Sequence, residues 1–449
     1  MRVLVITRSP WDDTNSTGNT MSNLWSGYDS QSIANIYCRV SKPNNLTCRK
    51  YYSISEEDLL KSIFNRKYLA GKKFKWSNDF DTGVIEDKEI LSEKRLYDYF
   101  RGKSSLLAHW IQELIWKFGN WKNEKLDEFL LEFKPDIIFF PCFAPMYTHR
   151  LLWYIQKKTN AKVVLFHADD YLTLYGQNGR SLGAINKKIR SRIVANSSKK
   201  ADINYCISPK QQKEYSHLLN RPMKLLFKGK EFSEQPINKI PDEKVIRIVY
   251  VGSTQYGRWR TLGMLSKEIQ KINVNAKKVQ FELLIYSQYK PSKKEEKAMI
   301  LDGASRFMGK IPADQVPQVL READIVLHIE SFERKERLST RLSFSTKIVD
   351  CLHSGRSILA IGWKEAASID YLIKNDAALV ATDEQSLGKL LTQIQKNPTI
   401  LSEYAQKAWK CGEKNHQISK IQQSLYEDLS MIHNETHISI LPKKMLREN

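Results

Sequence analysis

Short apolar runs alternate along this chain with segments whose apolar residues recur every three or four positions. In the first half, Val3 to Thr7, Lys134 to Cys142 and Ala161 to Asp170 are predicted as buried strands. Tyr147 to Lys158 and Ile185 to Lys200 are predicted as helices between or after them. Strands that alternate with helices predict a parallel sheet that is covered on both faces.

The same alternation restarts after residues 233–244, which combine two prolines with charge and lack apolar periodicity. We interpret this stretch as a linker between two α/β sheets of comparable size. A long helical segment is expected from about Asp383 to Ile432. The strands expected after the linker are VIRIVYVGS, VQFELLIYS, Ala323 to His328, Ser357 to Ile361 and Ala378 to Ala381.

Unusual polar residues follow several of these strands. In open α/β sheets, ligands bind beyond the carboxyl ends of the strands. Two such sheets that face each other would form a cleft, and each domain would contribute residues that bind one ligand there. This arrangement points to a two-substrate enzyme. The segments at these ends are Arg8 to Gly18, His167 to Asp170, Ser253 to Arg260, Glu330, and Ser343 to Lys347.

The segment FSTKIVDCLHSGRSILAIG, from Phe344 to Gly362, carries the clearest sign of ligand chemistry. Ser345 and Thr346 are expected to cap a helix over Lys347 to His353. The free amides of such a helix start, together with its dipole, can hold a diphosphate. Asp350 lies one turn further along the same face and can accept hydrogen bonds from ribose hydroxyls. An ordinary loop–helix–strand unit of an α/β sheet is the alternative.

A second group of candidates opens the second domain. Gly252 and Ser253 follow a strand, where a glycine allows a ligand to approach the backbone closely. Arg258 and Arg260 can pair with phosphate oxygens, although a surface loop with two arginines is the alternative. Glu330 ends another strand and could also meet the same ligand.

The first domain offers candidates for a second substrate. His167, at the end of a strand, could orient or deprotonate a hydroxyl, and a structural histidine is the alternative. Asp169 and Asp170 could bind hydroxyls of that substrate or a metal ion. Neighbouring residues of an extended segment point to opposite faces, so the pair is weak evidence for a metal. Gly18 and Asn19, near a helix start, could approach the substrate or simply form a capping turn.

The segment LLAHWIQELIWKFGNW, from Leu106 to Trp121, has an apolar face at helical spacing. We favour a buried core helix, and a helix at a membrane interface is the alternative. The charged run from Glu333 to Arg341 is expected to be a solvated loop. The residues of the apolar face are Leu107, Trp110, Ile111, Leu114, Ile115 and Phe118.

Composition narrows the class of protein. The formal net charge is +21, which favours a polyanionic partner such as nucleic acid, anionic lipid or a phosphorylated substrate. No run of about 18 apolar residues is present, and the start of the chain lacks the pattern of a signal peptide. We therefore expect a cytoplasmic protein. The six cysteines form no CxxC pair, so neither a zinc site nor a disulfide framework is expected.

These segments together resemble glycosyltransferases of the GT-B fold, in particular the large family-4-like group that acts in bacterial surface-glycan synthesis. The resemblance covers nearly the whole chain and is strongest from Ile248 to Gly362. It implies two Rossmann-like, doubly wound domains that face each other across a cleft. The implied acceptor domain spans residues 1–235 and the nucleotide-sugar domain spans 245–405. A helix over 406–433 would cross back to the first domain, before a tail over 434–449.

The resemblance also implies roles for single residues. Ser345, Thr346 and Lys347 would hold the diphosphate, and Asp350 takes the place of the family's ribose-binding glutamate. Arg258 falls near the basic residue that pairs with the phosphates. The family's pair of glutamates is incomplete, because Leu342 fills the first position. His167 matches the histidine beside the donor sugar.

The expected activity is transfer of a sugar, of the hexosyl type and with retention, from a nucleotide sugar to an acceptor hydroxyl. His167, Arg258 and Lys347 are the expected catalytic residues; no metal or other cofactor is expected. The acceptor is expected to be a lipid-linked or polymeric glycan, with peripheral contact to the anionic inner face of the cell membrane. No nucleic-acid partner is expected. The alternatives are another GT-B enzyme, such as a sugar-nucleotide epimerase or a polyol-phosphate transferase, and a basic nucleic-acid-binding protein.

Overall fold

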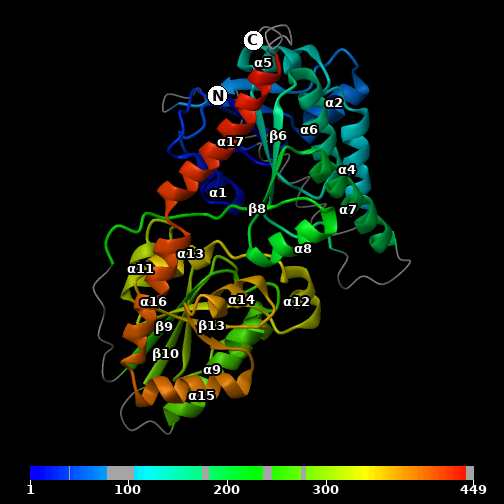
Figure 1. The fold of residues 1–449 in the computed structure, drawn as a ribbon. Helices are drawn as coiled ribbons and strands as arrows, with labels where there is room; N and C mark the ends of the chain where they lie inside the picture. Colours follow the sequence, from blue (N-terminus) through cyan, green and yellow to red (C-terminus); the bar gives the residue numbers. More distant parts are fainter. Residues whose placement is uncertain (40, 78–105, 174–181, 236–244, 275–279, 441–449) are drawn as a thin grey trace, which may run out of the picture. The chain divides into compact units, whose positions relative to one another are not determined.

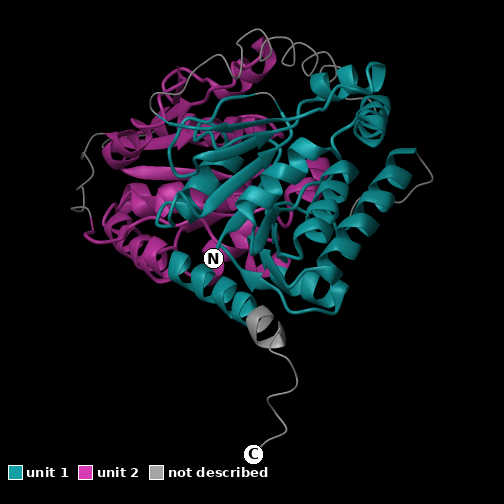
Figure 2. Ribbon diagram, turned by 90° about the horizontal axis from the view of Figure 1, so that it is seen from above, with its two compact units in different colours: residues 1–207, 212–226, 421–449 teal, residues 208–211, 227–420 magenta. Residues whose placement is uncertain are grey.

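The computed structural model describes the chain except residues 40, 78–105, 174–181, 236–244, 275–279 and 441–449 (Figure 1). The described chain forms two compact units (Figure 2). Unit 1 comprises residues 1–207, 212–226 and 421–449, and unit 2 comprises residues 208–211 and 227–420. Most of the predicted linker, 236–244, lies outside the described residues.

Unit 1 is built on an eight-stranded sheet in the order β4-β3-β2-β1-β5-β6-β7-β8. All neighbouring strands are parallel except β3 and β4. The strand order reverses between β1 and β5, so the loops after these two strands diverge at this point. The strands are β1 (Val3–Thr7), β2 (Ile33–Tyr37), β3 (Lys50–Ser53), β4 (Lys72–Lys75), β5 (Ile137–Pro141), β6 (Lys162–His167), β7 (Ile203–Cys206) and β8 (Lys224–Leu225).

The helices of unit 1 confirm most of the predicted segments. The helix α1 begins at Ser16, where the Asn15 side chain accepts a hydrogen bond from the Gly18 N–H and caps it. The polar and aromatic stretch of about residues 50 to 100, for which the sequence alone orders no elements, contains β3, α2 and β4, and its part from residue 78 on lies outside the described residues. The helices are α1 (Ser16–Trp25), α2 (Glu56–Phe64), α4 (Leu106–Phe118), α5 (Glu124–Phe133), α6 (Met146–Thr159), α7 (Leu182–Lys200), α8 (Pro209–Leu219) and α17 (Ile418–Ile440).

The prediction that α4 buries its apolar face in the core is wrong for half of that face, and the other half (Trp110, Ile111 and Ile115) is only half-buried. Leu107, Leu114 and Phe118 are exposed, whereas Glu113 and Trp116 are buried. The reason is specific: the Glu113 carboxylate accepts a hydrogen bond of 2.6 Å from the first amide of α6, and the Trp116 ring stacks on Tyr147 of that helix. These contacts turn the opposite face of α4 inward. None of the helices in the described part of the chain is long and apolar enough to cross a membrane.

Unit 2 is built on a fully parallel six-stranded sheet in the order β11-β10-β9-β12-β13-β14. Numbered within the unit, this order is 3-2-1-4-5-6, that of a dinucleotide-binding Rossmann fold, with its reversal between β9 and β12. A cluster of buried, mostly aliphatic residues from these strands and from α9 (Arg258–Val274) and α15 (Glu384–Lys396) forms the core. The strands are β9 (Val245–Val251), β10 (Gln280–Tyr286), β11 (Ser305–Gly309), β12 (Ile325–Ile329), β13 (Ser357–Ile361) and β14 (Leu379–Ala381).

The helices of unit 2 correct two expectations. The run that was expected to be a solvated loop forms a helix, α12, whose Arg337 guanidinium lies 5.0 Å from the centre of the Trp363 ring. The predicted long helical segment is three helices, because Pro398 interrupts the first and His416 the second. The helices are α9 (Arg258–Val274), α10 (Lys293–Met299), α11 (Val316–Glu322), α12 (Arg334–Thr340), α13 (Lys347–His353), α14 (Ala367–Lys374), α15 (Glu384–Lys396) and α16 (Ile400–Asn415).

Candidate functional site

Four of the predicted site residues come together in unit 2, at the carboxyl ends of β9 and β12. Gly252 directly follows β9, and Glu330 directly follows β12. A Cβ atom at Gly252 would lie 2.7 Å from Nζ of Lys347, so the glycine leaves room for this ammonium. Arg258 begins α9 and reaches the carboxylate of Glu330. The cluster therefore occupies the point where the strand order reverses, which is where ligands bind in such sheets.

Glu330 is buried and holds Arg258 in place. Its Oε2 lies 3.1 Å from Nη2 of Arg258, and its Oε1 accepts a hydrogen bond of 3.2 Å from the Ser368 hydroxyl. The hydroxyl of Thr261 donates to the Glu330 carbonyl oxygen at 3.0 Å. Both carboxylate oxygens are thus engaged within the protein. These contacts favour a positioning role for Glu330 over the ligand contact that the sequence suggested.

Lys347 carries the accessible positive charge of the cluster. Its side chain is exposed, but the protein around the ammonium removes part of its hydration, and the charge of Arg258 repels it. Together these effects lower the pKa of Lys347 to about 8. An anion placed between Lys347 and Arg258 would relieve this repulsion. The two cations therefore form a site suited to a phosphate or diphosphate group.

The helix and the strand that were predicted between Phe344 and Gly362 are confirmed with the expected bounds, as α13 and β13. The predicted side-chain cap is wrong, because Thr346 at the N-cap position makes no side-chain capping bond. Instead, the Ile348 N–H donates to the Ser345 carbonyl oxygen at 3.0 Å. The Ser345 and Thr346 side chains are half-buried next to Lys347.

Asp350 lies one turn beyond Lys347 and forms ion pairs with two lysines that sequence analysis did not assign to the site. Its Oδ1 lies 3.0 Å from Nζ of Lys230, and its Oδ2 lies 3.9 Å from Nζ of Lys228. These lysines belong to the basic stretch before the predicted linker, which was visible in the sequence only as charge. The Lys230 N–H also donates to the His416 carbonyl oxygen, which fixes this segment beside α13.

Ser253 and Arg260 take part in the turn that leads into α9. The Ser253 carbonyl oxygen accepts a hydrogen bond of 2.7 Å from the Tyr250 hydroxyl. Tyr256 and Gly257 in this turn both have positive φ, 56° and 73°. Arg260 lies against the ring of its neighbour Trp259 and 3.6 Å from the carboxylate of Glu333. These contacts connect Arg260 with Glu333 and not with Lys347.

His167 does not present its ring to the surface of unit 1. The side chain is fully buried, and its Nε2 lies 3.3 Å from both the Asn204 Oδ1 and the Ser198 hydroxyl. Burial lowers its pKa to about 4, so the imidazole is neutral. The Tyr215 ring packs against it. These are the surroundings of a structural histidine, and they do not support the catalytic role expected from the sequence.

The two aspartates that follow have different surroundings. Asp170 accepts hydrogen bonds from the Thr173 N–H at 3.0 Å and from the Tyr215 hydroxyl at 2.9 Å, so it stabilises the loop. Asp169 is exposed and accepts a hydrogen bond of 3.1 Å from the Tyr171 hydroxyl. Nearby protein raises the pKa of Asp169 through desolvation. Asp169 is thus the better candidate of the two for contact with a substrate.

Gly18 and Asn19 lie in the first turn of α1, where Gly18 is buried. A Cβ atom at Gly18 would overlap the backbone of Asp12, so the glycine is needed for packing of the chain against itself. This supports the capping turn that was the alternative interpretation. Among the residues that the structure describes, no cluster of three or more His, Cys, Asp or Glu side chains could hold a metal ion.

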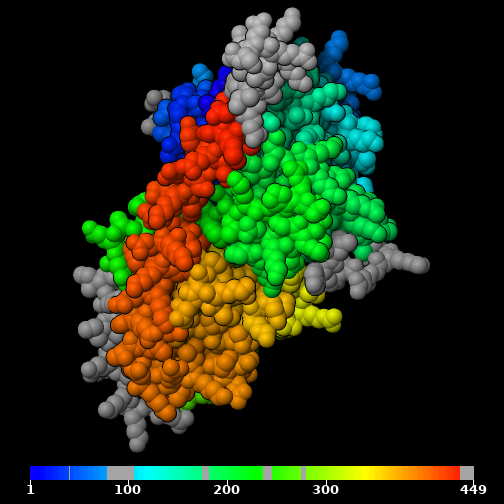
Figure 3. Space-filling model, viewed as in Figure 1, coloured from blue at the N-terminus to red at the C-terminus, as the bar shows by residue number. Residues whose placement is uncertain are grey.

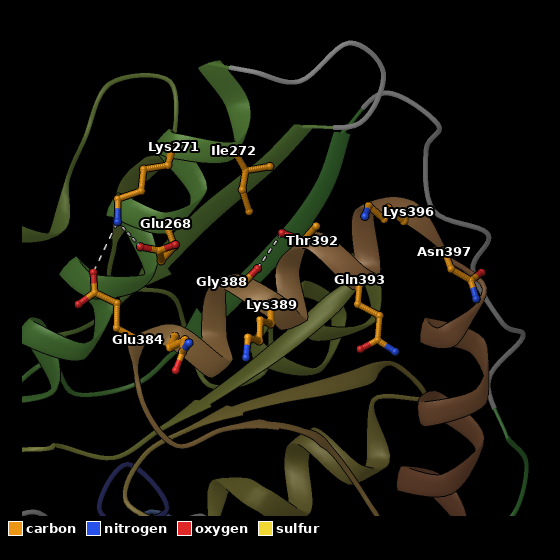
Figure 4. Close-up of a pocket in the computed structure, with 11 residues that line it drawn as sticks. Glu268, Lys271, Ile272, Glu384, Gly388, Lys389, Thr392, Gln393, Lys396 and Asn397 are labelled. Atoms are coloured by element: carbon orange, nitrogen blue, oxygen red, sulfur yellow. Dashed lines mark hydrogen bonds and ion pairs between the residues drawn. The ribbon is translucent and has the colours of Figure 1, made fainter.

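A hollow of about 940 Å³ lies elsewhere in unit 2, between α9 and α15 (Figure 4). It lies beside Glu268 and Lys271, ten or more residues along α9 from Arg258, or about 15 Å at the rise of a helix. Lys271 pairs with Glu268 of the same helix at 2.5 Å and with Glu384 of α15 at 3.6 Å. The hollow is open and its acidic groups are paired, so we do not assign it to the candidate site.

Comparison with known proteins identifies the fold. No family model and no curated protein matches the sequence. The Anabaena protein HepE, solved with UDP, is 11% identical with a TM-score of 0.62 over 96% of this chain and all of that one. Sucrose-phosphate synthase from Thermosynechococcus elongatus is 10% identical with a TM-score of 0.62, over 97% of this chain and 100% of that one.

A third similar structure is WaaG, described as a glycosyltransferase involved in lipopolysaccharide biosynthesis. It is 12% identical with a TM-score of 0.54, over 94% of this chain and 98% of that one. These matches extend over nearly the full length of each chain, which agrees with the two parallel-rich α/β sheets described above. The chain therefore has the GT-B fold, the two-domain, Rossmann-like architecture of these glycosyltransferases.

Proposed function

We propose that the protein is a glycosyltransferase that moves a sugar from a nucleotide-sugar donor to an acceptor hydroxyl. The observation that carries the proposal is the placing of Lys347 over Gly252, with Arg258 nearby, at the strand reversal of unit 2. Two positive charges at this point of a Rossmann sheet suit a nucleoside diphosphate. Similar structures were solved with UDP and with UDP-glucose bound, in the case of HepE.

Different residues of unit 2 bind different parts of the donor. Lys347 and Arg258 pair with the diphosphate oxygens, and the Ser345 and Thr346 hydroxyls add hydrogen bonds to them. Gly252 lets the diphosphate approach the backbone beside Lys347. Glu330 keeps the Arg258 guanidinium oriented, since it binds the other side of that group.

The base and ribose of the donor would be held beside the diphosphate. Asp350 accepts hydrogen bonds from the ribose hydroxyls, and Lys230 restrains its carboxylate. Asp is one methylene shorter than the glutamate that the family pattern has at this position. The restraint by Lys230 therefore matters more here, because it fixes the position of a shorter side chain.

The chemistry follows from the charge that develops on the leaving group. As the bond between the sugar and the diphosphate breaks, negative charge grows on the diphosphate oxygens. Lys347 and Arg258 stabilise this charge, so the reaction needs no metal ion. The new glycosidic bond forms to the acceptor oxygen, whose proton is released, and we propose that the sugar keeps its anomeric configuration. Analysis of the product anomer by NMR tests that last point.

The acceptor is proposed to be a lipid-linked or polymeric glycan of a surface polysaccharide, with the protein acting at the inner face of the cell membrane. The net charge of +21 supports an anionic surface as a partner. WaaG, which is described as involved in lipopolysaccharide biosynthesis, has the same fold. In unit 1, exposed Asp169 is the residue that we would assign to an acceptor hydroxyl.

A binding and turnover experiment tests this function. The full chain is titrated with UDP, UDP-glucose and other nucleotide sugars, and thermal unfolding is followed in parallel. A true donor at about 100 times its dissociation constant should add about 2.7 kcal/mol of stability. Release of free nucleoside diphosphate that depends on an added glycan acceptor would confirm transfer. Interconversion of the nucleotide sugar without acceptor would instead indicate an epimerase and would overturn the proposal.

A further inference from the structure

An apolar surface on unit 1 is formed by the outer face of α4 and the end of α2. Four side chains form this α2–α4 surface, and their exposed fractions are 88% for Phe64, 67% for Leu107, 64% for Phe118 and 48% for Leu114. At about 100° per residue, the three on α4 lie within an arc of roughly 40°. In Figure 3 the residues of α4 are cyan and lie at the edge of unit 1.

The outward orientation of α4 is fixed by the contacts on its other face. The Glu113 carboxylate, which is buried, accepts the Met146 N–H and lies 2.9 Å from Nη2 of Arg150. The Trp116 and Tyr147 rings stack with centres 4.3 Å apart. Rotation of α4 to bury its leucines would expose Trp116 and leave the start of α6 without its cap. The apolar face is therefore held outward by the fold.

The surface is continuous between the two helices and has a basic rim. The Asn120 N–H, two residues beyond Phe118, donates to the Ser62 hydroxyl at 2.8 Å, which brings the ends of α4 and α2 together. The rim consists of three exposed cations, Arg66, Lys67 and Lys117. The acidic residues of α2 and α4 are engaged with protein groups, as in the pairs Glu57 with Lys61 and Glu113 with Arg150.

We propose that the α2–α4 surface docks the protein on an anionic lipid bilayer. Aromatic and leucine side chains enter the boundary between headgroups and acyl chains, while a rim of lysine and arginine pairs with lipid phosphates. A second copy of the chain suits the surface less well, because pairing would bring two basic rims together. The inference deepens the proposed function and rests on it in one respect: a lipid-linked acceptor is presented at such a membrane.

Co-sedimentation of the full chain with vesicles tests the surface. The vesicles contain equal parts of phosphatidylglycerol and phosphatidylcholine, or phosphatidylcholine alone. We expect the wild type to bind the anionic vesicles and to release as salt rises. The partition coefficient of the double variant Phe64→Ser, Phe118→Ser into anionic vesicles should be at least tenfold lower than that of the wild type. The triple variant Arg66→Gln, Lys67→Gln, Lys117→Gln should lose the preference for anionic vesicles.

A matched control removes apolar surface elsewhere in unit 1. Leu131 and Leu218 are 68% and 54% exposed on α5 and α8, so Leu131→Ser, Leu218→Ser should bind vesicles as the wild type does. All these residues are exposed, and unchanged thermal unfolding would show that each variant folds. The proposal is overturned if the wild type fails to bind, if the phenylalanine variant binds normally, or if that variant only turns a dimer into a monomer. UDP binding by the same variants reports separately on the proposed function.

Discussion

The Arg258 guanidinium and the Glu330 carboxylate lie 3.1 Å apart, at the start of α9 and directly after β12. The side chain of Glu330 is only 6% exposed, and that of Arg258 is 20% exposed. Because the pair is largely removed from water, each charge depends on the other, and removal of one leaves the other uncompensated. The pair thus joins the two strand ends between which the strand order of unit 2 reverses.

Replacement of Arg258 by alanine should lower both stability and turnover. Stability should fall by about 3–5 kcal/mol, because Glu330 is left buried without its partner. Turnover should fall by a further, separate effect of about 10²- to 10³-fold, because one charge that stabilises the leaving diphosphate is lost. Urea unfolding and steady-state kinetics measure the two effects.

The double variant Arg258→Ala, Glu330→Gln separates these effects. It removes both charges, so much of the lost stability should return while turnover stays low. If turnover returned along with stability, Arg258 would act only as a structural partner of Glu330, and its assignment to the leaving diphosphate would be wrong.

The pKa of Lys347 predicts how donor binding depends on pH. The pKa in the folded protein is lowered to about 8, so the ammonium loses its proton as pH rises through this value. Affinity for UDP should therefore be constant below about pH 7 and weaken above pH 8, by up to tenfold per pH unit. Isothermal titration from pH 6.5 to 9.5 measures the profile.

Variants of Lys347 supply the control for this profile. Lys347→Arg keeps a charge that does not titrate in this range, so binding should become independent of pH. Lys347→Met should bind UDP weakly at every pH. A wild-type profile that stayed flat to pH 9.5 would show that the Lys347 ammonium does not contact the diphosphate.

Much of unit 2 could be predicted from the sequence, because its helices and strands have strong local signals. The segment from Lys347 to Ile361 has a helix and a strand joined by a tight turn at Gly355, where φ is 69°. The candidate ligand-binding residues of this segment could be predicted because the order of helices and strands in an α/β sheet indicates where ligands bind. Gly252 directly follows β9, whereas Arg258 and Lys347 are the first residues of the helices α9 and α13, so that their approach depends on how these helices follow the strands.

The rest could not be predicted, because it depends on contacts between residues distant in the sequence. Nothing local to α4 indicates that Glu113 would cap α6, 33 residues later, and so turn the leucines outward. The burial of His167 depends on Asn204 and Ser198, which approach it from β7 and α7. Asp350 likewise pairs with Lys230 across 120 residues of chain, and charge alone did not identify that partner.

Buried histidines predict loss of stability in mild acid. Burial lowers the pKa of His149, His167, His328 and His416 to about 4 each. Between pH 6.5 and 4 the unfolded chain binds these protons and the folded chain does not, so stability is complete above pH 6.5 and falls as pH decreases. At pH 5 the loss should be about 2 kcal/mol for each histidine.

The variant His149→Gln tests this dependence away from the candidate donor site. Urea unfolding at several values between pH 7.5 and 4.5 gives the slope of stability against pH. The slope should decrease by the equivalent of about one proton in the variant. Equal slopes in His149→Gln and the wild type would show that His149 does not contribute to the acid sensitivity.

Asp350 provides the test of how the nucleoside is held. The carboxylate can accept two hydrogen bonds from neighbouring ribose hydroxyls, while Lys230 at 3.0 Å keeps it in place. Asp350→Asn removes the charge but keeps the shape, so affinity for UDP should fall by about 1.5–3 kcal/mol, or roughly 10- to 150-fold. The wild type should bind 2′-deoxy-UDP more weakly than UDP, and the variant should discriminate much less between them. Lys230→Met should also weaken the binding of UDP, but by less than Asp350→Asn does, because it loosens the carboxylate without removing it.

Competition titration of UDP and 2′-deoxy-UDP against the wild type and Asp350→Asn gives the four affinities needed. If Asp350→Asn weakened UDP and 2′-deoxy-UDP equally, the carboxylate would act through Lys230 and Lys228 on the phosphates, and the ribose contact would have to be sought in other residues near α13.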